Sequence, residues 1–181
     1  MEANTVLKAR HLSYKTELDI NNNLRIQNTQ NKLFDLAPTS PNFRINRITD
    51  SKIEATAEVL NKIFGLARLK ELNERGERLS MIYRLSPRGK ILEVQFVVQD
   101  VDTLLTVEEL EILEQQLKAD ITYDILWENE KNQIETNFAF TTAALPFNLI
   151  VAIVDEEAKV GRKVINVTLT PPLLPDHLKN L

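Results

Sequence analysis

The chain has 181 residues, of which 43% are hydrophobic, so it is long enough to bury a core within one domain. It has no cysteine and four glycines, which excludes disulfide scaffolds, thiolate metal sites, cysteine nucleophiles and the usual glycine-rich phosphate loop. The formal net charge is −4, but residues 44–90 carry eleven Lys and Arg against six Asp and Glu, whereas residues 91–160 carry three against fifteen.

The first elements predicted along the chain form an N-terminal β-hairpin. Residues 12–20 alternate between apolar and polar side chains, which is the period of a strand with one buried face. The three asparagines at 21–23 favour a turn because asparagine tolerates the left-handed region, and residues 24–27 can pair back. Residues 28–42 are polar, contain two prolines and predict a loop, and residues 43–48 predict a further short strand.

A broken helix is predicted next. Ser51 and Glu54 have the spacing of a capping box, and apolar residues then recur at helical intervals. Gly65 interrupts this pattern, and a second short helix is predicted over residues 66–73. Gly76 favours a left-handed cap at its end.

A β-hairpin is predicted over residues 79–98. The turn is Ser-Pro-Arg-Gly at 86–89, where the proline presets φ and the glycine tolerates positive φ. The return strand is predicted to place on one face Leu92, Val94, Phe96 and Val98, and on the other Glu93 and Gln95. One side of the hairpin is therefore apolar and has to be covered.

The cover is a helix that begins after Thr106. Thr106 and Glu109 predict a reciprocal capping box, flanked by a hydrophobic staple of Leu105 and Leu110. The helix is predicted to place on its apolar stripe Val107, Leu110, Leu113 and Leu117, and on the opposite side Glu108, Glu111 and Gln115. Carboxylates in the first turn of a helix interact favourably with the helix dipole and stabilise the helix, so they need no catalytic explanation.

The remaining residues predict strands. Residues 121–127 alternate as a strand, residues 128–133 form a polar loop, and residues 134–140 predict a strand antiparallel to the previous one. The apolar run at 149–154 and the β-branched run at 164–170 predict a third hairpin.

Together these elements predict the α+β class. We expect a mainly antiparallel sheet built around a hairpin-helix-strand unit, covered on one face by two or three helices, with additional β-hairpins at both ends. We expect one domain over residues 1–181, in which the N-terminal hairpin and loop occupy 1–37, the core 43–141, and the C-terminal hairpin and tail 142–181.

No residue pattern predicts catalysis, a cofactor or a metal site. His11 and His177 have no third partner at a useful spacing. The paired carboxylates lie in predicted loops or in a first helical turn, where solvated acidic residues are ordinary. The spacing of a calcium loop begins at Asp19, but Leu24 replaces the obligatory glycine. We therefore expect a protein that is not an enzyme.

The basic segment offers a candidate interaction face. Its members would be Arg68, Lys70, Arg75, Arg78, Arg84 and Arg88. An ordinary mixed surface is favoured, because segments of opposite charge interleave on folding, and the alternative is a basic face for an anionic partner. The aromatics of this segment, Phe64 and Tyr83, occupy predicted core positions, which leaves no stacking platform for a specific nucleic acid.

A family resemblance rests on residues 72–125, with Ser-Pro-Arg-Gly-Lys-Ile-Leu-Glu-Val at 86–94 and Leu-Thr-Val-Glu-Glu-Leu at 105–110. This stretch resembles uncharacterised small envelope proteins of gut bacteria. The order helix, hairpin, helix, strand is also similar to the C-terminal domain of TonB-type energy transducers. That similarity implies protein binding at a sheet edge in the periplasm. The hairpins predicted at both ends depart from the TonB pattern.

We therefore expect a protein-interaction or structural protein with an unknown protein partner and an open oligomeric state. One alternative is a small-molecule binding module with an apolar cavity between helices and sheet, lined by Tyr123, Trp127, Phe138 and Phe140; core packing of these aromatics is favoured over it. A further alternative is polyanion binding by the basic segment. No apolar run is long enough to span a bilayer, and we expect an envelope or periplasmic location if a leader was trimmed and a cytoplasmic one otherwise.

Overall fold

The computed structural model describes residues 1–37, 45–49, 53–99 and 101–168, of which residues 46 and 160–168 are described by their backbone alone. The elements in chain order are β1 (Val6–Lys8), β2 (Ser13–Leu18), β3 (Leu24–Asn28), η1 (Leu33–Asp35), β4 (Ile45–Thr49), α1 (Ile53–Arg75), β5 (Leu79–Leu85), β6 (Ile91–Val98), α2 (Val107–Asp120), β7 (Asp124–Trp127), α3 (Glu130–Glu135), β8 (Ala139–Leu145) and α4 (Phe147–Thr168).

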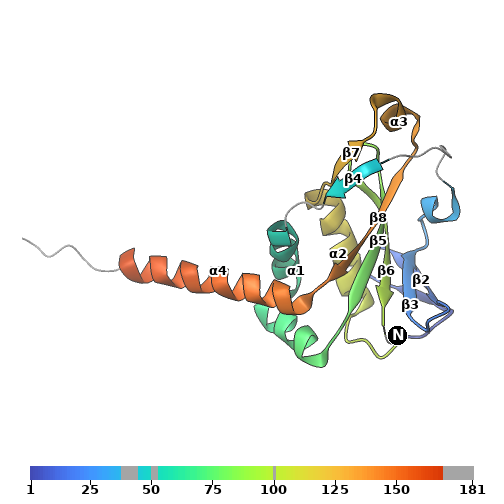
Figure 1. Cartoon of the computed structure of the whole chain (residues 1–181). Helices are drawn as coiled ribbons and strands as arrows, with labels where there is room; N and C mark the ends of the chain where they lie inside the picture. Colours follow the sequence, from blue (N-terminus) through green and yellow to red (C-terminus); the bar gives the residue numbers. More distant parts are fainter. Residues whose placement is uncertain (38–44, 50–52, 100, 169–181) are drawn as a thin grey trace, which may run out of the picture.

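Six strands form one antiparallel sheet in the order β1-β2-β3-β6-β5-β8, and β4 pairs with β7 in a second sheet. Helices α1 and α2 lie on one side of the large sheet, and α4 leaves the end of β8 and packs against α1 (Figure 1). Buried side chains from both layers form one core. The predicted α+β class with a mainly antiparallel sheet is confirmed. Across the described ranges, no helix is long and apolar enough to cross a membrane.

The β5–β6 hairpin has the predicted turn, with Gly89 at a φ of +80°. A register shift between Arg84 and Leu85 places Ile91 opposite Leu85, so β6 bulges at Leu92. The prediction that Leu92 faces the core is therefore wrong. Ile91 is 5% exposed and takes that place, whereas Leu92 is 39% exposed.

The opposite face of β6 is covered by the loop that follows β3. The buried carboxylate of Glu93 accepts hydrogen bonds from the backbone N–H groups of Lys32 and Leu33 at 2.7 and 2.9 Å. The side-chain amide of Asn31 donates to the carbonyl oxygen of Val94 at 2.8 Å. These contacts hold the loop across the sheet, because a buried carboxylate needs hydrogen-bond donors to offset its desolvation.

Helix α1 breaks where the sequence predicts. Gly65 has φ and ψ of 69° and 157°, which are not helical. At the C-terminal end, the N–H of Gly76 donates to the carbonyl of Asn73 and the N–H of Glu77 to that of Leu72, both at 3.0 Å. This is the Schellman arrangement, with Gly76 at a φ of +75°, so the predicted left-handed cap is confirmed.

Helix α2 begins with the predicted capping box. The Thr106 hydroxyl accepts from the N–H of Glu109 at 3.1 Å, and the Glu109 carboxylate accepts from the N–H of Thr106 at 2.8 Å. The apolar stripe is also confirmed, since Leu110, Leu113 and Leu117 are at most 1% exposed.

Replacing Thr106 with alanine is expected to lower the free energy of unfolding by about 1 kcal/mol, because the backbone N–H of Glu109 loses its side-chain acceptor. Urea denaturation followed by the fluorescence of Trp127 measures this loss. The variant Thr106→Ser keeps the hydroxyl and should lose less than half as much. Equal losses in the two variants would contradict the capping explanation.

Two carboxylates of α2 attach the N-terminal strands to the helix. Glu111 is 2% exposed and accepts from the backbone N–H of His11 at 3.0 and 3.1 Å. The sequence pattern placed it on the exposed side, which is wrong. Glu114 is 1% exposed and accepts from the hydroxyl of Tyr14 at 2.8 Å and from the amide of Asn28 at 3.3 Å. Burial and then the charge of Glu114 raise the pKa of Tyr14.

The strands after α2 differ from the prediction in their pairing. Strand β7 leaves the large sheet and pairs with β4, and β8 is antiparallel to β5 instead of β7. Residues 130–135 form the short helix α3, whereas the sequence predicts a loop at 130–133 and a strand at 134–140, which begins only at Ala139. The side chain of Asn129 caps α3 by accepting from the N–H of Asn132 at 2.9 Å. The predicted strand at 43–48 corresponds to β4, although residues 43 and 44, like the predicted cap residue Ser51, lie outside the described residues.

The predicted C-terminal hairpin is wrong, because residues 147–168 form the helix α4. Its buried side chains Phe147, Ile150 and Val154 recur at intervals of three and four, so they lie on one helical face. A short apolar run does not distinguish a buried strand from the buried face of a helix. The tail beyond residue 168 lies outside the described residues.

Candidate functional site

Two of the predicted basic side chains form ion pairs within the fold. Arg68 donates from Nε to Glu109 at 2.9 Å, and also to Glu71 at 2.8 Å and to the carbonyl of Leu104 at 2.6 Å. The hydrogen bond to Glu109 raises the pKa of Arg68. This side chain therefore joins α1 to the start of α2 and is occupied by internal partners.

Lys70 contacts α4. Its Nζ lies 3.0 Å from a carboxylate oxygen of Asp155, whose other oxygen lies 3.0 Å from Nζ of Lys159. These two lysines lower the pKa of Asp155, with the Lys159 hydrogen bond as the larger cause. Asp155 is the first of three consecutive acidic residues at 155–157, and in the structure its carboxylate pairs with two lysines.

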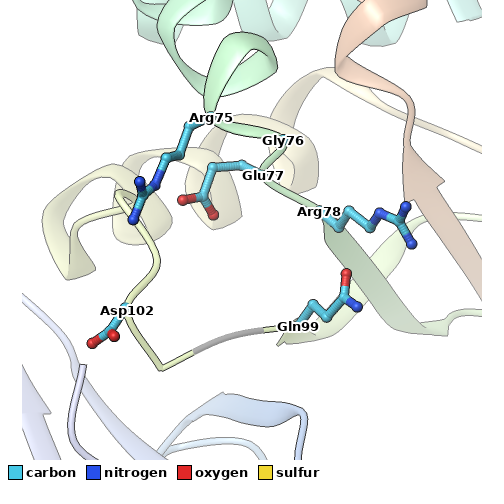
Figure 2. A pocket seen from close by; sticks show the side chains of 6 residues that line it. All are labelled: Arg75, Gly76, Glu77, Arg78, Gln99 and Asp102. Carbon is cyan, nitrogen blue, oxygen red and sulfur yellow. The ribbon is translucent and has the colours of Figure 1, made fainter.

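Arg75 and Arg78 lie together at the turn between α1 and β5. They line an open depression of about 340 Å³ with Gly76, Glu77, Gln99 and Asp102 (Figure 2). Figure 2 shows the two guanidinium groups pointing to opposite sides of Glu77. The Glu77 carboxylate accepts from the Thr103 hydroxyl at 2.7 Å and from the Leu104 N–H at 2.8 Å. The depression thus carries both signs of charge.

Arg84 and Arg88 lie at the other end of β5. Arg84 is six residues beyond Arg78, which corresponds to roughly 20 Å along an extended strand. Arg88 is exposed in the turn between β5 and β6. The structure therefore brings Arg75 and Arg78 together and separates them from Arg84 and Arg88, and the six side chains do not form one continuous face.

A different feature, which the sequence pattern did not indicate, stands at the edge of the large sheet. Strand β8 has seven residues, Ala-Phe-Thr-Thr-Ala-Ala-Leu, and all seven pair in register with β5. It contains no charged residue and no proline. In the described part of the chain, no strand pairs with its outer side. Exposed edges of this kind are usually short, charged or bulged, because they pair readily with other chains.

The register shows which backbone groups of β8 point outward. In an antiparallel ladder, alternate residues direct both N–H and C=O to the same neighbouring strand. Two hydrogen bonds show which residues of β2 and β3 bond each other. The N–H of Asp19 donates to the carbonyl of Asn23, and the N–H of Thr29 donates to the carbonyl of Ser13, both at 2.9 Å. The odd-numbered residues of the two strands therefore bond each other. The registers of the β3–β6, β6–β5 and β5–β8 pairs then determine which residues of each later strand bond which neighbour.

By this alternation, residues 79, 81, 83 and 85 of β5 form the backbone hydrogen bonds to β8. Their partners are Leu145, Ala143, Thr141 and Ala139, in that order. The remaining positions of β8 direct their backbone groups to the open edge. The outward backbone N–H and C=O groups of Thr142 and Ala144 form no hydrogen bond with any described residue. Both side chains are exposed.

The core beside this edge is nearly full. A cavity of about 30 Å³ lies where Ala143 and Leu145 meet side chains of α1, α2 and α4, including Ile53, Leu117 and Ile150. This volume holds a single water or methyl group, whereas small-molecule sites occupy roughly 300 Å³ or more. The described core therefore offers no support for the predicted apolar ligand cavity.

An arginine lies on aromatic rings next to the β8 edge. The guanidinium carbon of Arg84 lies 4.4 Å from the ring centre of Phe34, 5.3 Å from that of Phe138 and 5.8 Å from that of Phe140. Phe138 is fully buried, as core packing predicts, but Phe140 is 52% exposed, so its predicted core position is wrong. The cross-strand partner of Phe140 is Arg84 itself.

The remaining candidate chemistry resolves into local structure. The carboxylate of Asp19 accepts from the N–H groups of Asn21 at 2.8 Å and Asn23 at 3.0 Å, which closes the hairpin turn. Glu109 serves the capping box. Within the described ranges, no three His, Asp or Glu side chains are placed to hold a metal ion.

A crystal structure of a DUF5043 family protein from Bacteroides uniformis has a similar fold. The TM-score is 0.59 at 16% sequence identity, and the match covers 79% of this chain and 90% of that chain. Comparison with protein-family models and with curated proteins gives no match. The resemblance to gut-bacterial proteins is thus confirmed as a shared fold with a domain of unknown function, and the likeness to TonB-type domains stays a prediction.

Proposed function

We propose that this chain is a non-enzymatic protein-binding module, which takes up an extended segment of a partner protein as an additional strand along β8. The observation that carries the proposal is the outward set of backbone groups at Thr142 and Ala144, on a straight edge without charge or proline. In strand addition, such groups supply the affinity through main-chain hydrogen bonds, and side-chain positions on alternate faces supply the specificity.

The two edges of the sheet differ in a way that supports this assignment. At the opposite edge, β1 has three residues, ends in Lys8 and is followed closely by Arg10. Short length and positive charge discourage pairing with another chain. Strand β8 has neither protection. A fold that protects one edge and leaves the other open is expected when the open edge has a partner.

The other functions considered from the sequence have less support. Polyanion binding requires a continuous basic surface, whereas Arg68 and Lys70 are paired with carboxylates and Arg84 lies far from Arg78. Ligand binding in the core requires a cavity, and the one beside β8 measures about 30 Å³.

The substitution Thr142→Pro tests the proposal. Proline removes the outward N–H of residue 142 but none of the bonds between β8 and β5, so the sheet should remain folded. Ten-residue peptides selected from a random displayed library on the wild-type chain serve as probes. Their affinity, measured by fluorescence polarisation, should fall at least about tenfold on Thr142→Pro, because one main-chain hydrogen bond is lost and the ring obstructs the edge.

The control Thr142→Val keeps the N–H and should bind the same peptides within about threefold, a difference of less than 1 kcal/mol. Hydrogen exchange gives a second measurement, in which bound peptide should slow the amides of Thr142 and Ala144 more than those of β1. Peptides that bind Thr142→Pro as tightly as wild type would overturn the proposal, as would a selection that yields no binder.

A further inference from the structure

The guanidinium of Arg84 lies among aromatic rings but makes few hydrogen bonds. Its one hydrogen bond to a described residue is from Nε to the carbonyl of Leu33, at 3.3 Å. No described carboxylate forms an ion pair with it. Glu93, whose charge acts on Arg84, uses its oxygens to accept from the backbone N–H groups of Lys32 and Leu33. A guanidinium has five N–H donors, so most of the capacity of Arg84 is unused among the described residues.

Burying part of a charged guanidinium without a carboxylate partner costs free energy, and a bound carboxylate would offset that cost. Burial lowers the pKa of Arg84, and the charge of Glu93 opposes that effect, although the group stays protonated at neutral pH. The guanidinium lies over the ring of Phe34 and within 6 Å of the ring centres of Phe138 and Phe140, so aromatic rings replace part of its water. A guanidinium that is stacked and half-desolvated is preorganised to bind a carboxylate through two parallel hydrogen bonds.

The position of Arg84 relates this group to the open edge. Arg84 and Phe140 are cross-strand partners on the sheet face opposite the helices, and Phe140 belongs to β8. A strand added beside β8 would place alternate side chains on that same face, next to Phe140 and Thr142. Such a strand lies two strand spacings from β5, roughly 10 Å, which two long side chains extended toward each other can span.

We propose that the segment bound along β8 carries an acidic side chain on this outer face, near Phe140, and that Arg84 pairs with its carboxylate. The inference rests on the proposed strand addition and adds the chemistry of the partner. A glutamate reaches Arg84 more easily than an aspartate, because its side chain is one methylene longer. The pair would lie partly over the aromatic rings, where an ion pair is less screened than in open solvent.

A double-mutant cycle tests the pairing. Peptides selected as described above should be enriched in glutamate at one position, and the probe is one such peptide with its Glu→Gln counterpart. The glutamate peptide should bind wild type at least about tenfold more tightly than the glutamine peptide, and the preference should vanish in Arg84→Gln. Arg84→Lys keeps the charge without the planar fork and should retain a smaller preference.

Arg78→Gln is the matched control, because Arg78 is exposed at the other end of β5. It should leave the preference for glutamate unchanged. Melting temperatures of all variants show whether Arg84→Gln remains folded, and Arg84→Lys keeps the test decisive if it does not.

The outcomes separate the two proposals. Peptides that lose affinity on Thr142→Pro but bind equally with glutamate or glutamine would overturn the role of Arg84 and leave strand addition standing. A preference for glutamate that persists in Arg84→Gln would also overturn it. Peptides insensitive to Thr142→Pro would overturn strand addition itself.

Discussion

Replacing Glu114 with alanine is expected to lower the free energy of unfolding by about 3–5 kcal/mol, because a buried hydrogen-bonding network loses its central acceptor. Glu114 accepts from Tyr14 at 2.8 Å and from Asn28 at 3.3 Å, and its other contact is Lys118 at 2.5 Å. The substitution leaves the Tyr14 hydroxyl and the Asn28 amide buried without an acceptor. These groups belong to β2 and to the end of β3, so the N-terminal strands should detach first.

Urea denaturation followed by circular dichroism measures the loss. Glu108→Ala provides the control, since Glu108 is exposed on the same helix and its removal should cost less than about 1 kcal/mol through the helix dipole. If Glu114→Ala cost no more than Glu108→Ala, the buried network would not be what attaches the N-terminal strands to α2.

Gly89→Ala is the second substitution with a large expected effect. A Cβ atom at this position would lie 1.7 Å from the carbonyl oxygen of Tyr123, so the turn between β5 and β6 would have to move. That movement breaks the hydrogen bond from the N–H of Tyr123 to the carbonyl of Gly89, which measures 2.9 Å. With the positive φ added, we expect a loss of about 3 kcal/mol or more.

Gly76→Ala is a matched control for Gly89→Ala. Gly76 has a φ of +75°, close to the +80° of Gly89, but a Cβ atom at Gly76 meets nothing within 4 Å. Its loss should therefore be the conformational cost alone, about 1–2 kcal/mol. The fluorescence of Trp127, whose Nε1 donates to Pro87 in the same turn at 3.1 Å, should change in the native state of Gly89→Ala. Equal losses in the two glycine variants would rule out the close contact as the cause.

Local signals in the sequence predicted local structure well. The capping box at Thr106, the turn ending at Gly89 and the left-handed cap at Gly76 each depend on a few adjacent residues, and each is present. The amphipathic stripe of α2 is likewise a property of its own spacing.

The features that the sequence pattern did not predict depend on contacts between residues far apart in the chain. Glu111 is buried because His11, one hundred positions earlier, presents a backbone N–H to it. The apolar run at 149–154 lies in helix α4, which packs against α1. Strand β8 could be recognised as a strand in part, but its edge position depends on β7 pairing with β4.

The surroundings of the β8 edge and of Arg84 depend on contacts that the sequence does not show. The sequence drew attention to basic residues, and charge along a chain does not reveal which side chains pair after folding. Arg84 was among them, but the role proposed for it depends on three rings, which come from η1, from β8 and from the residue before β8. The outward direction of the Thr142 and Ala144 backbone groups follows from a register that no local pattern contains.

The composition of β8 also bears on solubility. Alanine and threonine occupy five of its seven positions, and alanine is a poor strand former with little apolar surface. Segments that drive aggregation combine strong strand preference with high hydrophobicity. We therefore expect an edge with few large apolar side chains to hold an unrelated chain weakly, and under the proposed strand addition a bound segment would owe its selectivity to its own matching side chains.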